Sequence, residues 1–127
     1  MCHSPQEFYK KMAVDRHNKR LGEAGEKQAV QYLKRSGYKI LKRNYRNPFG
    51  EVDIIASKGD TVAFIEVKTR LSENYGAPSE AVGRDRIERY KRAAEYYFYG
   101  KQIGFTVRFD IIEIACGQIN HIENAFY

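Results

Sequence analysis

The sequence predicts an α/β fold in which a mixed β-sheet is flanked by helices. A helical pattern is followed by three segments of strand character, and a second helical pattern is followed by two more. The chain has 127 residues, of which 43% are hydrophobic, and it contains 10 Tyr and 7 Phe, which is enough for one core. We therefore expect one domain over residues 17–127, in the order αβββαββ, preceded by an arm or short helix at residues 1–16.

The first helix is expected from about residue 19 to residue 35, because a glycine two residues later stops the pattern. Its apolar stripe contains Ala29, Val30 and Leu33, and Glu26 stands one turn before that stripe. This carboxylate is therefore expected on the core-facing side. It has two explanations: an ion pair with an arginine at the helix edge, or membership of a polar site on the neighbouring sheet.

Three strands are expected next, at residues 38–45, 51–57 and 61–70. The last two are rich in Val, Ile and Phe, and Gly59-Asp60 between them suits a two-residue hairpin turn. A turn of that length sets the register of the hairpin, and with it the face on which each side chain lies.

This register places four charged residues on one face of the sheet. A two-residue turn puts Asp53 opposite Glu66 and Glu51 opposite Lys68. Because side chains alternate along a strand, all four are expected to project to the same side. The other face carries six apolar side chains that form an ordinary core: Val52, Ile54, Ala56, Ala63, Ile65 and Val67.

Charged side chains are rarely buried in strands unless they are paired or bind something. Opposed carboxylates repel, and Mg²⁺ or Mn²⁺ between Asp53 and Glu66 would turn that repulsion into ligation, because hard cations prefer oxygen ligands. The backbone carbonyl of Val67 is a further candidate ligand, and Lys68 could orient a water or stabilise developing negative charge. The alternative is a polar end of the sheet held by ion pairs, Glu51 with Lys68 and Asp53 with an arginine, since such networks imitate active sites.

The second half of the chain supplies a loop, a helix and two strands. Residues 72–78 form a Gly- and Pro-containing loop, a natural flap over a site. The helix is capped by Ser79 or Asp85 and extends to about residue 99, and strands follow at residues 105–116 and 118–126. The inward positions expected for this helix are Ile87, Tyr90, Ala94, Tyr97 and Phe98.

The charge and the cysteine content restrict the class of partner and the compartment. A net charge of +6 and a pI near 9.3 point to nucleic acid or an anionic membrane surface, or to a basic protein that binds neither. No apolar run approaches the ~20 residues that span a bilayer, and the N-terminus lacks a hydrophobic signal core. The two cysteines form neither a disulfide framework nor a zinc pattern, and the three histidines lack metal-ligand spacing. We expect a cytoplasmic protein with reduced cysteines and surface histidines.

Several basic and aromatic side chains are candidates for contacting nucleic acid. The arginines on the outer side of the second helix, including Arg89 and Arg92, are expected to be solvated one by one, but together they could follow a phosphate backbone. The tyrosines of that helix are expected in the core or an interface, while Tyr45 and Tyr75 are the candidates for contacting a splayed base. The candidate nucleic-acid-binding residues are Glu51, Arg70, Arg84, Arg86 and Tyr45.

The spacing of Asp53 from Glu66-Val67-Lys68 resembles the PD-(D/E)XK signature of restriction-endonuclease-like nucleases. The chain resembles more closely the YraN-type family, which comprises predicted endonucleases distantly related to archaeal Holliday junction resolvases. The resemblance covers about residues 18–115 and rests mainly on the linked GEVDIIA and FIEVKTR segments. The other matching positions are Gly22, Gly25, Glu26, Ala29, Asn44, Tyr45 and residues 108–110.

This resemblance implies a restriction-endonuclease-like three-layer sandwich with a central mixed β-sheet flanked by helices. It implies metal-ligand roles for Asp53 and Glu66, with Mg²⁺ or Mn²⁺ as the cofactor. It also implies the catalytic lysine role for Lys68 and the helix carboxylate role for Glu26.

Two residues depart from the family pattern. Val52 stands at the proline position of the signature, where the neighbouring carboxylate carries the chemistry. Arg86 stands where relatives tend to have a lysine on the second helix. An arginine is compatible with phosphate binding, but its bidentate guanidinium and the point charge of a lysine are not interchangeable.

The sequence thus supports one main expectation and two alternatives. The main expectation is a metal-dependent endonuclease that hydrolyses DNA phosphodiester bonds, on branched or otherwise structured DNA. The first alternative is a non-catalytic nucleic-acid-binding module of the same fold. The second is an interaction protein that uses its tyrosine-rich helix as a homodimer face. This role is compatible with either of the other two. A two-fold dimer would suit a nuclease, because it places two sites symmetrically on two DNA strands.

Overall fold

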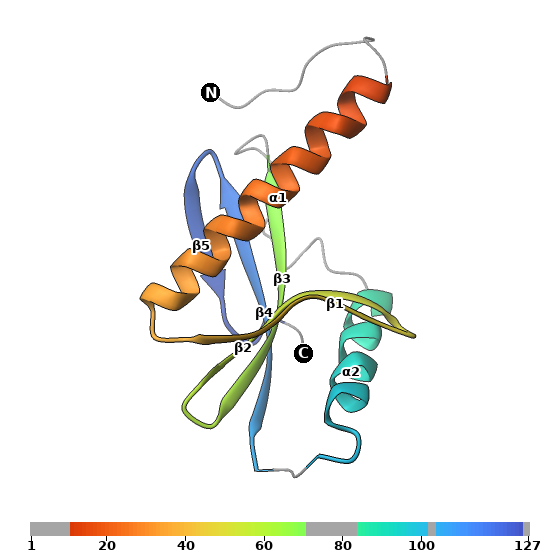
Figure 1. Ribbon diagram of the computed structural model, residues 1–127, viewed down its shortest axis with the longest axis vertical. Helices are drawn as coiled ribbons and strands as arrows, with labels where there is room; N and C mark the ends of the chain where they lie inside the picture. The colour runs from red at the N-terminus through yellow and green to blue at the C-terminus, as the bar shows by residue number, and fades with distance from the viewer. Residues whose placement is uncertain (1–10, 71–83, 102–103, 126–127) are drawn as a thin grey trace.

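The computed structural model describes residues 11–70, 84–101 and 104–125 (Figure 1). Within these ranges, two helices and five strands follow one another in the order that the sequence predicts. The elements are α1 (Lys11–Arg35), β1 (Lys39–Asn47), β2 (Gly50–Lys58), β3 (Thr61–Arg70), α2 (Arg84–Phe98), β4 (Thr106–Ala115) and β5 (Gln118–Ile122). The predicted α/β class is confirmed.

The five strands form one mixed sheet in the order β1-β2-β3-β4-β5. Neighbouring strands are antiparallel except β3 and β4, which run parallel. A parallel pair needs a crossover connection, and α2 lies in the connection between these two strands. One cluster of buried side chains joins α1 to one face of the sheet and a second joins α2 to the other face (Figure 1). This layering is that of a three-layer α/β sandwich.

The apolar stripes predicted for the two helices are confirmed. In α1, Ala29, Val30 and Leu33 are buried against β2 and β3. In α2, Tyr90 and Ala94 are buried, and the other three predicted inward positions are partly buried against the same cluster. Neither of the helices in the described ranges is long and apolar enough to cross a membrane.

Two element boundaries differ from the expected ones. The helix α1 begins at Lys11, before the expected start, because no glycine or proline between this residue and Leu21 interrupts it. The strand β5 ends at Ile122, before the expected end, because Asn124 has a φ of 54° and leaves the extended conformation. Of the two expected caps of α2, Asp85 lies inside its first turn.

Other expectations fall on residues that the structure does not describe. The expected flap at residues 72–78, with Tyr75, and the expected cap Ser79 lie outside the described ranges. Cys116, in the turn between β4 and β5, is disulfide-bonded. The expectation of reduced cysteines is therefore wrong for this residue.

The predicted hairpin register is confirmed close to the turn and is then interrupted. The strands β2 and β3 pair with this register from the turn up to Ile54. Because the ladder ends there, Asp53 with Glu66 and Glu51 with Lys68 are not the ladder partners that the sequence predicted. Beyond this point β2 stays with β1 and β3 stays with β4, so the sheet divides. Figure 1 shows the β1–β2 hairpin bending away from β3 towards α2, and we call the place where the strands separate the fork.

The fork also changes the face on which Val52 lies. Ile54 and the other predicted core positions of the hairpin pack beneath α1 as expected, but Val52 lies in the other cluster, with Tyr90 of α2. The prediction for Val52 is therefore wrong. Residues two apart share a face in a regular strand, so alternation along β2 is interrupted between Val52 and Ile54, where Asp53 has no partner in either ladder and Asn44 on β1 has a φ of 52°. Asparagine tolerates this left-handed conformation better than most residues.

A buried carboxylate joins β4 to the end of the chain. Asp110 is 0% exposed, accepts hydrogen bonds from Arg108 and from the backbone N–H of Asn124, and lies 2.8 Å from His121 Nε2. Burial raises the pKa of Asp110, but its hydrogen bonds with His121 and Arg108 outweigh burial and hold that pKa below its usual value. The side chain of His121 is 6% exposed, so the expected surface position is wrong for this histidine.

Gly25 lets α1 approach β3 closely. It is buried, and a Cβ at this position would lie 2.2 Å from Oγ1 of Thr69. Gly22, one turn earlier, faces open space. The close approach at Gly25 positions the next residue, Glu26, beside the fork.

The two glycines allow a matched test of this packing. In Gly22→Ala and Gly25→Ala the alanine favours the helix by about 0.5–1 kcal/mol. At Gly25 the added methyl group also overpacks against Thr69, which costs about 1–3 kcal/mol. We therefore expect Gly25→Ala to be less stable than Gly22→Ala by about 1–3 kcal/mol in urea unfolding followed by circular dichroism. Equal stabilities of the two variants would contradict the close packing.

Candidate active site

The candidate site lies in the fork, where the side chain of Asp53 takes the place of a strand partner. Its Oδ2 accepts a hydrogen bond of 2.9 Å from the backbone N–H of Val67. The ladder between β2 and β3 has already ended at Ile54, so this bond satisfies an amide of β3 that would otherwise lack its cross-strand acceptor. The carboxylate is thus held in position by the backbone of the neighbouring strand.

Other carboxylates surround Asp53. The pKa of Asp53 is raised to about 6, and burial is the largest cause. The hydrogen bond from Val67 lowers this pKa, and the negative charges of Glu66, Glu26 and Glu51 raise it. Among the described residues, no basic side chain forms an ion pair with Asp53, whereas each of the other three carboxylates has one. Asp53 is therefore the least compensated charge of the group.

Glu66 is buried on the α2 side with one oxygen paired and the other unpaired. Its Oε2 forms an ion pair with Arg86 of α2 and lies 3.7 Å from Nζ of Lys68. Its Oε1 is buried and has no hydrogen-bond partner among the described residues. Leaving a buried acceptor unpaired is costly, so this atom indicates a place for a cation or a hydrogen-bond donor.

Glu26 reaches the fork from α1. Its Oε1 accepts hydrogen bonds from Arg43 at 3.2 Å and from Nδ2 of Asn44 at 3.1 Å, both from β1. The sequence left two explanations open for the core-facing position of Glu26, and pairing with an arginine is the first of them. The other also has support, because Glu26 borders the same hollow as Asp53 and raises the pKa of that residue.

Two hollows meet at Asp53. One has a volume of about 470 Å³ and lies beside α1, and the other has a volume of about 180 Å³ and lies beside α2. Asp53 and Glu51 line both, while Glu26 and Val67 line only the first and Glu66 lines only the second. The structure thus brings the predicted carboxylates together around Asp53, with Glu26 and Glu66 on opposite sides of it.

Two of the predicted nucleic-acid-binding residues have other surroundings, and the side chain of a third is not described. Arg70 forms an ion pair with Glu113 of β4. Tyr45 is half-buried and packs edge-to-face on Tyr97, with 5.5 Å between the ring centroids. Arg84 begins α2, but its side chain is outside the described part of the chain.

Basic side chains also border the site, and the sequence analysis did not single out the two of them that come from β1. Arg43 pairs with the helix carboxylate, and Arg46 donates to Glu51 at 3.4 Å. Arg89 lines the hollow beside α2 together with Arg86. The spacing of Arg89 from Arg86, one helical turn, is a sequence signal for its position. No local pattern marks the two arginines of β1, because their position depends on the fork.

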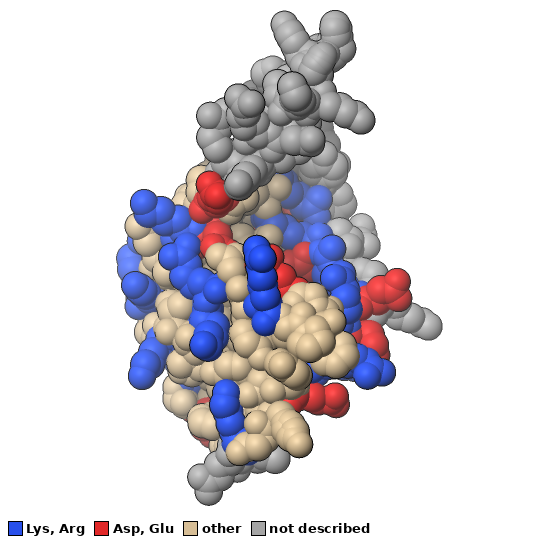
Figure 2. Space-filling model, turned by 45° about the vertical axis from the view of Figure 1, so that its right-hand side comes forward, with Lys and Arg blue, Asp and Glu red and all other residues tan. Residues whose placement is uncertain are grey.

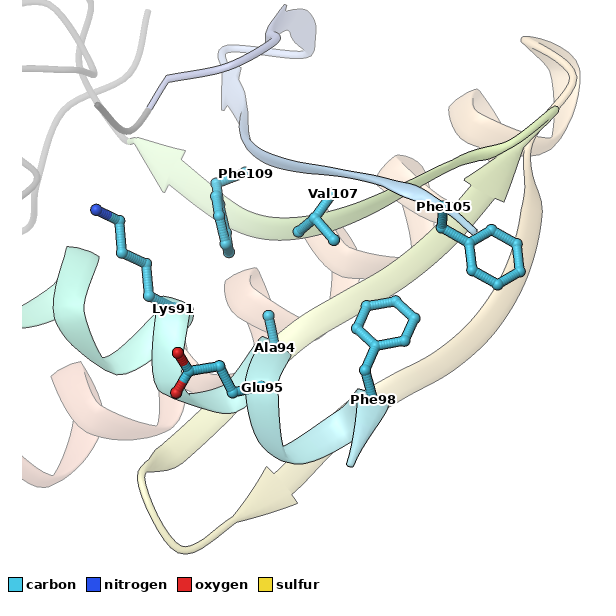
Figure 3. A pocket seen from close by; sticks show the side chains of 7 residues that line it. All are labelled: Lys91, Ala94, Glu95, Phe98, Phe105, Val107 and Phe109. Carbon is cyan, nitrogen blue, oxygen red and sulfur yellow. The ribbon is translucent and has the colours of Figure 1, made fainter. Parts of the chain in front are cut away.

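A larger hollow, of about 520 Å³, lies between α2 and β4 (Figure 3). The rings of Phe98 and Phe105 stack at its end, with 6.1 Å between their centroids. Its lining consists of Lys91, Ala94, Glu95, Phe98, Phe105, Val107 and Phe109. With one lysine and one glutamate as its charged groups, this hollow offers no cluster of carboxylates, and its size does not make it the site of chemistry.

The donor set in the fork fits a divalent cation. Asp53 and Glu66 line one hollow, and one buried oxygen of Glu66 is without a partner. Among the described residues, no three His, Cys, Asp or Glu side chains lie close enough together to hold a metal ion by themselves. A cation here would therefore take two carboxylates and complete its coordination with the carbonyl of Val67 and water, and Mg²⁺ commonly keeps several waters in this way.

Comparison with protein families places these residues in a known group. The model of the uncharacterised protein family UPF0102 matches residues 25–114. The chain belongs to this family. The matched segment contains all four carboxylates of the fork together with Lys68, Arg86 and Asp110.

Individual members of UPF0102 match nearly their whole length. The UPF0102 protein of Thermodesulfovibrio yellowstonii is 48% identical over 107 residues, which cover 84% of this chain and 96% of that protein. The UPF0102 protein of Clostridium acetobutylicum is 48% identical over 120 residues, which cover 89% of this chain and 98% of that protein. The UPF0102 protein of Alkaliphilus oremlandii is 47% identical over 116 residues, which cover 86% of this chain and 99% of that protein. These names state a family and no activity, so the function has to be argued from the site.

The pKa of Asp53 predicts how stability changes with pH in the metal-free protein. This pKa is raised from 3.8 to about 6 on folding, so the stability associated with the neutral form is present below pH 3.8 and is lost as the pH rises through about 6. At pH 7 the ionised group costs up to about 3 kcal/mol. In Asp53→Asn the amide oxygen can still accept the hydrogen bond from Val67 without a charge.

We therefore expect Asp53→Asn to be more stable than the wild type at pH 7 and similar to it near pH 4. Urea unfolding in EDTA at pH 7 and at pH 4 measures the stabilities of the variant and the wild type. A variant that is less stable than the wild type at pH 7 would contradict the description of Asp53 as an uncompensated charge.

Proposed function

We propose that the protein is a metal-dependent endonuclease that hydrolyses DNA phosphodiester bonds, on branched or otherwise structured DNA. The observation that supports this most strongly is the pair of carboxylates in the fork. Asp53 has no cationic partner among the described residues, and Glu66 presents a buried Oε1 that accepts no hydrogen bond. A divalent cation would compensate both.

The residues around the fork match the needs of phosphodiester hydrolysis. A bound Mg²⁺ or Mn²⁺ would polarise the scissile phosphate and lower the pKa of a bound water. Asp53 and Glu66 would hold the cation, with the carbonyl of Val67 as a further ligand. Lys68, whose Nζ lies 3.7 Å from Oε2 of Glu66, can orient the water or offset negative charge on the phosphate. Glu26 would order the water on the α1 side of Asp53.

The basic surface near the fork suits a polyanionic substrate. Figure 2 looks towards the side that carries α2 and shows Lys and Arg side chains bordering this surface, with Asp and Glu side chains between them. Arg46 from β1 and Arg89 from α2 line the two hollows that meet at Asp53. Such contacts to phosphates position a substrate without reading its sequence. The homodimer expected from the sequence stays a prediction.

One observation favours the alternative, a non-catalytic nucleic-acid-binding module. Arg86 already neutralises Oε2 of Glu66 and could serve as a permanent substitute for a metal. The two functions differ in what they require of the carboxylates. A nuclease needs Asp53 and Glu66 for cleavage, whereas a binding module would bind DNA without them.

A cleavage assay tests the proposed function directly. Four-way junction, single-stranded and duplex DNA are each incubated with the purified protein and Mg²⁺ or Mn²⁺. We expect metal-dependent cleavage, and a decrease of about 10²–10⁴-fold in Asp53→Asn, Glu66→Gln and Lys68→Met. Glu95→Gln removes an exposed carboxylate of α2 away from the fork and is the matched control, with unchanged activity.

The outcomes of this assay separate the two functions. Salt-dependent DNA binding without cleavage, unaffected by Asp53→Asn, would support the binding module. Cleavage that persists in Asp53→Asn would place the chemistry outside the fork and contradict the proposal.

The ion pair of Arg86 predicts a change in metal affinity. Since Arg86 and a cation compete for Glu66, we expect Arg86→Gln to bind Mn²⁺ about tenfold more tightly than the wild type in isothermal titration calorimetry. Arg92→Gln is the control, because Arg92 is exposed on the same helix and pairs with Glu88 instead. Weaker Mn²⁺ binding by Arg86→Gln would mean that Arg86 positions Glu66 for the metal and does not compete with it.

A further inference from the structure

Two arginines and two aromatic rings gather beside the fork. We call this group the arginine–aromatic patch, and it consists of Phe49, Arg89, Arg92 and Tyr96. The three residues from α2 are spaced three and four positions apart, so they share one side of the helix. Phe49 comes from the turn between β1 and β2. Both arginines are exposed and Tyr96 is 50% exposed, so the patch faces the solvent.

The packing of the β1–β2 turn on α2 assembles the patch. The rings of Phe49 and Tyr96 meet edge-to-face, with 6.3 Å between their centroids and 76° between their planes. The guanidinium of Arg92 lies 5.9 Å from the centroid of the Phe49 ring. Arg89 lies close to Gly50, the first residue of β2, since a Cβ on this glycine would lie 3.3 Å from Nη1 of Arg89.

Arg89 connects the patch to the candidate active site. It lines the hollow of about 180 Å³ beside α2, together with Glu66 and Arg86. From this hollow, Arg86, Arg89, Arg92 and Tyr96 follow one another along α2. A nucleic-acid strand that leaves the fork along this helix would meet guanidinium groups first and aromatic rings after them.

We propose that the arginine–aromatic patch binds an unpaired strand of the DNA substrate, with a base stacked on the rings of Phe49 and Tyr96. This inference rests on the proposed nuclease function, for which it names the substrate class: DNA in which a single strand leaves the duplex beside the scissile bond. Guanidinium groups bind the phosphates, and aromatic rings stack on any base because every base has a π face. The bases of an intact duplex are stacked on one another, so the rings favour the unpaired strand.

The acidic neighbour of the patch is compatible with this role. Glu88 lies 3.6 Å from Arg92, and the two side chains are 62% and 55% exposed. An exposed ion pair of this kind contributes little, so a phosphate can replace Glu88 as the partner of Arg92. Within the described residues, Arg89 forms no ion pair with a carboxylate, which leaves its charge for the substrate.

Fluorescence anisotropy with the full chain in EDTA measures DNA binding separately from cleavage. The probes are a labelled oligothymidine of about 20 nucleotides, a duplex of equal length and a duplex with splayed arms. We expect Phe49→Ala and Tyr96→Ala each to weaken binding of the oligothymidine and the splayed duplex by about tenfold, and binding of the intact duplex by less than about twofold. Tyr96→Phe keeps the ring and should bind like the wild type.

Tyr99→Ala is the matched control, because Tyr99 is 78% exposed, directly follows α2 and lies outside the patch. Thermal unfolding of each variant verifies that it is folded. An equal loss for single-stranded and duplex DNA, or no loss in either ring variant, would overturn the inference while leaving the nuclease proposal intact. Since no metal is present, an inactive nuclease would not change these affinities, and the two proposals can fail separately.

Discussion

The hydrogen bond between the carboxylate of Asp53 and the backbone N–H of Val67 is the interaction on which the rest of the structure depends. It lies where β2 and β3 stop pairing, and it replaces the ladder contact that the two strands lose. A backbone amide in a half-buried sheet must find an acceptor, and here the acceptor is a charged side chain. The sheet can therefore divide without leaving this donor unsatisfied. The same bond holds a carboxylate between two hollows, at the point where α1 and α2 both reach the sheet.

The charges around the fork are compensated unequally. Glu26 is held by an arginine from β1, and Glu66 by an arginine from α2, so each helix is tied to the sheet through a carboxylate. From the part of the chain that the structure describes, Asp53 receives only a backbone hydrogen bond, and its raised pKa reflects burial beside these like charges. Within the described residues, an arrangement with one uncompensated carboxylate and one unpaired buried oxygen is unfavourable by itself. A bound divalent cation would compensate both groups, which is the physical basis of the proposed metal-dependent function.

The candidate site could be predicted from the sequence to the extent that it depends on residue type and local periodicity. The alternation of charged and apolar residues in the hairpin identified Asp53 and Glu66, and the helical stripe identified Glu26. The face of Val52 was predicted wrongly because alternation along β2 is interrupted at Asp53, where this strand has left its ladder with β3. The burial of His121 was also missed, because its partner Asp110 is on β4 and the pairing of two strands brings them together.

The sequence by itself determined the order of the elements, the apolar faces of both helices and the hairpin register near its turn, because these follow from spacing along one segment. It also determined which acidic residues stand at the edge of the apolar pattern. Only the tertiary structure decided that the hairpin divides from β3, that Arg86 and Glu66 meet, and that Phe49 reaches α2. These contacts join segments far apart in the chain, and they depend on where β2 leaves β3, a position that no local pattern encodes.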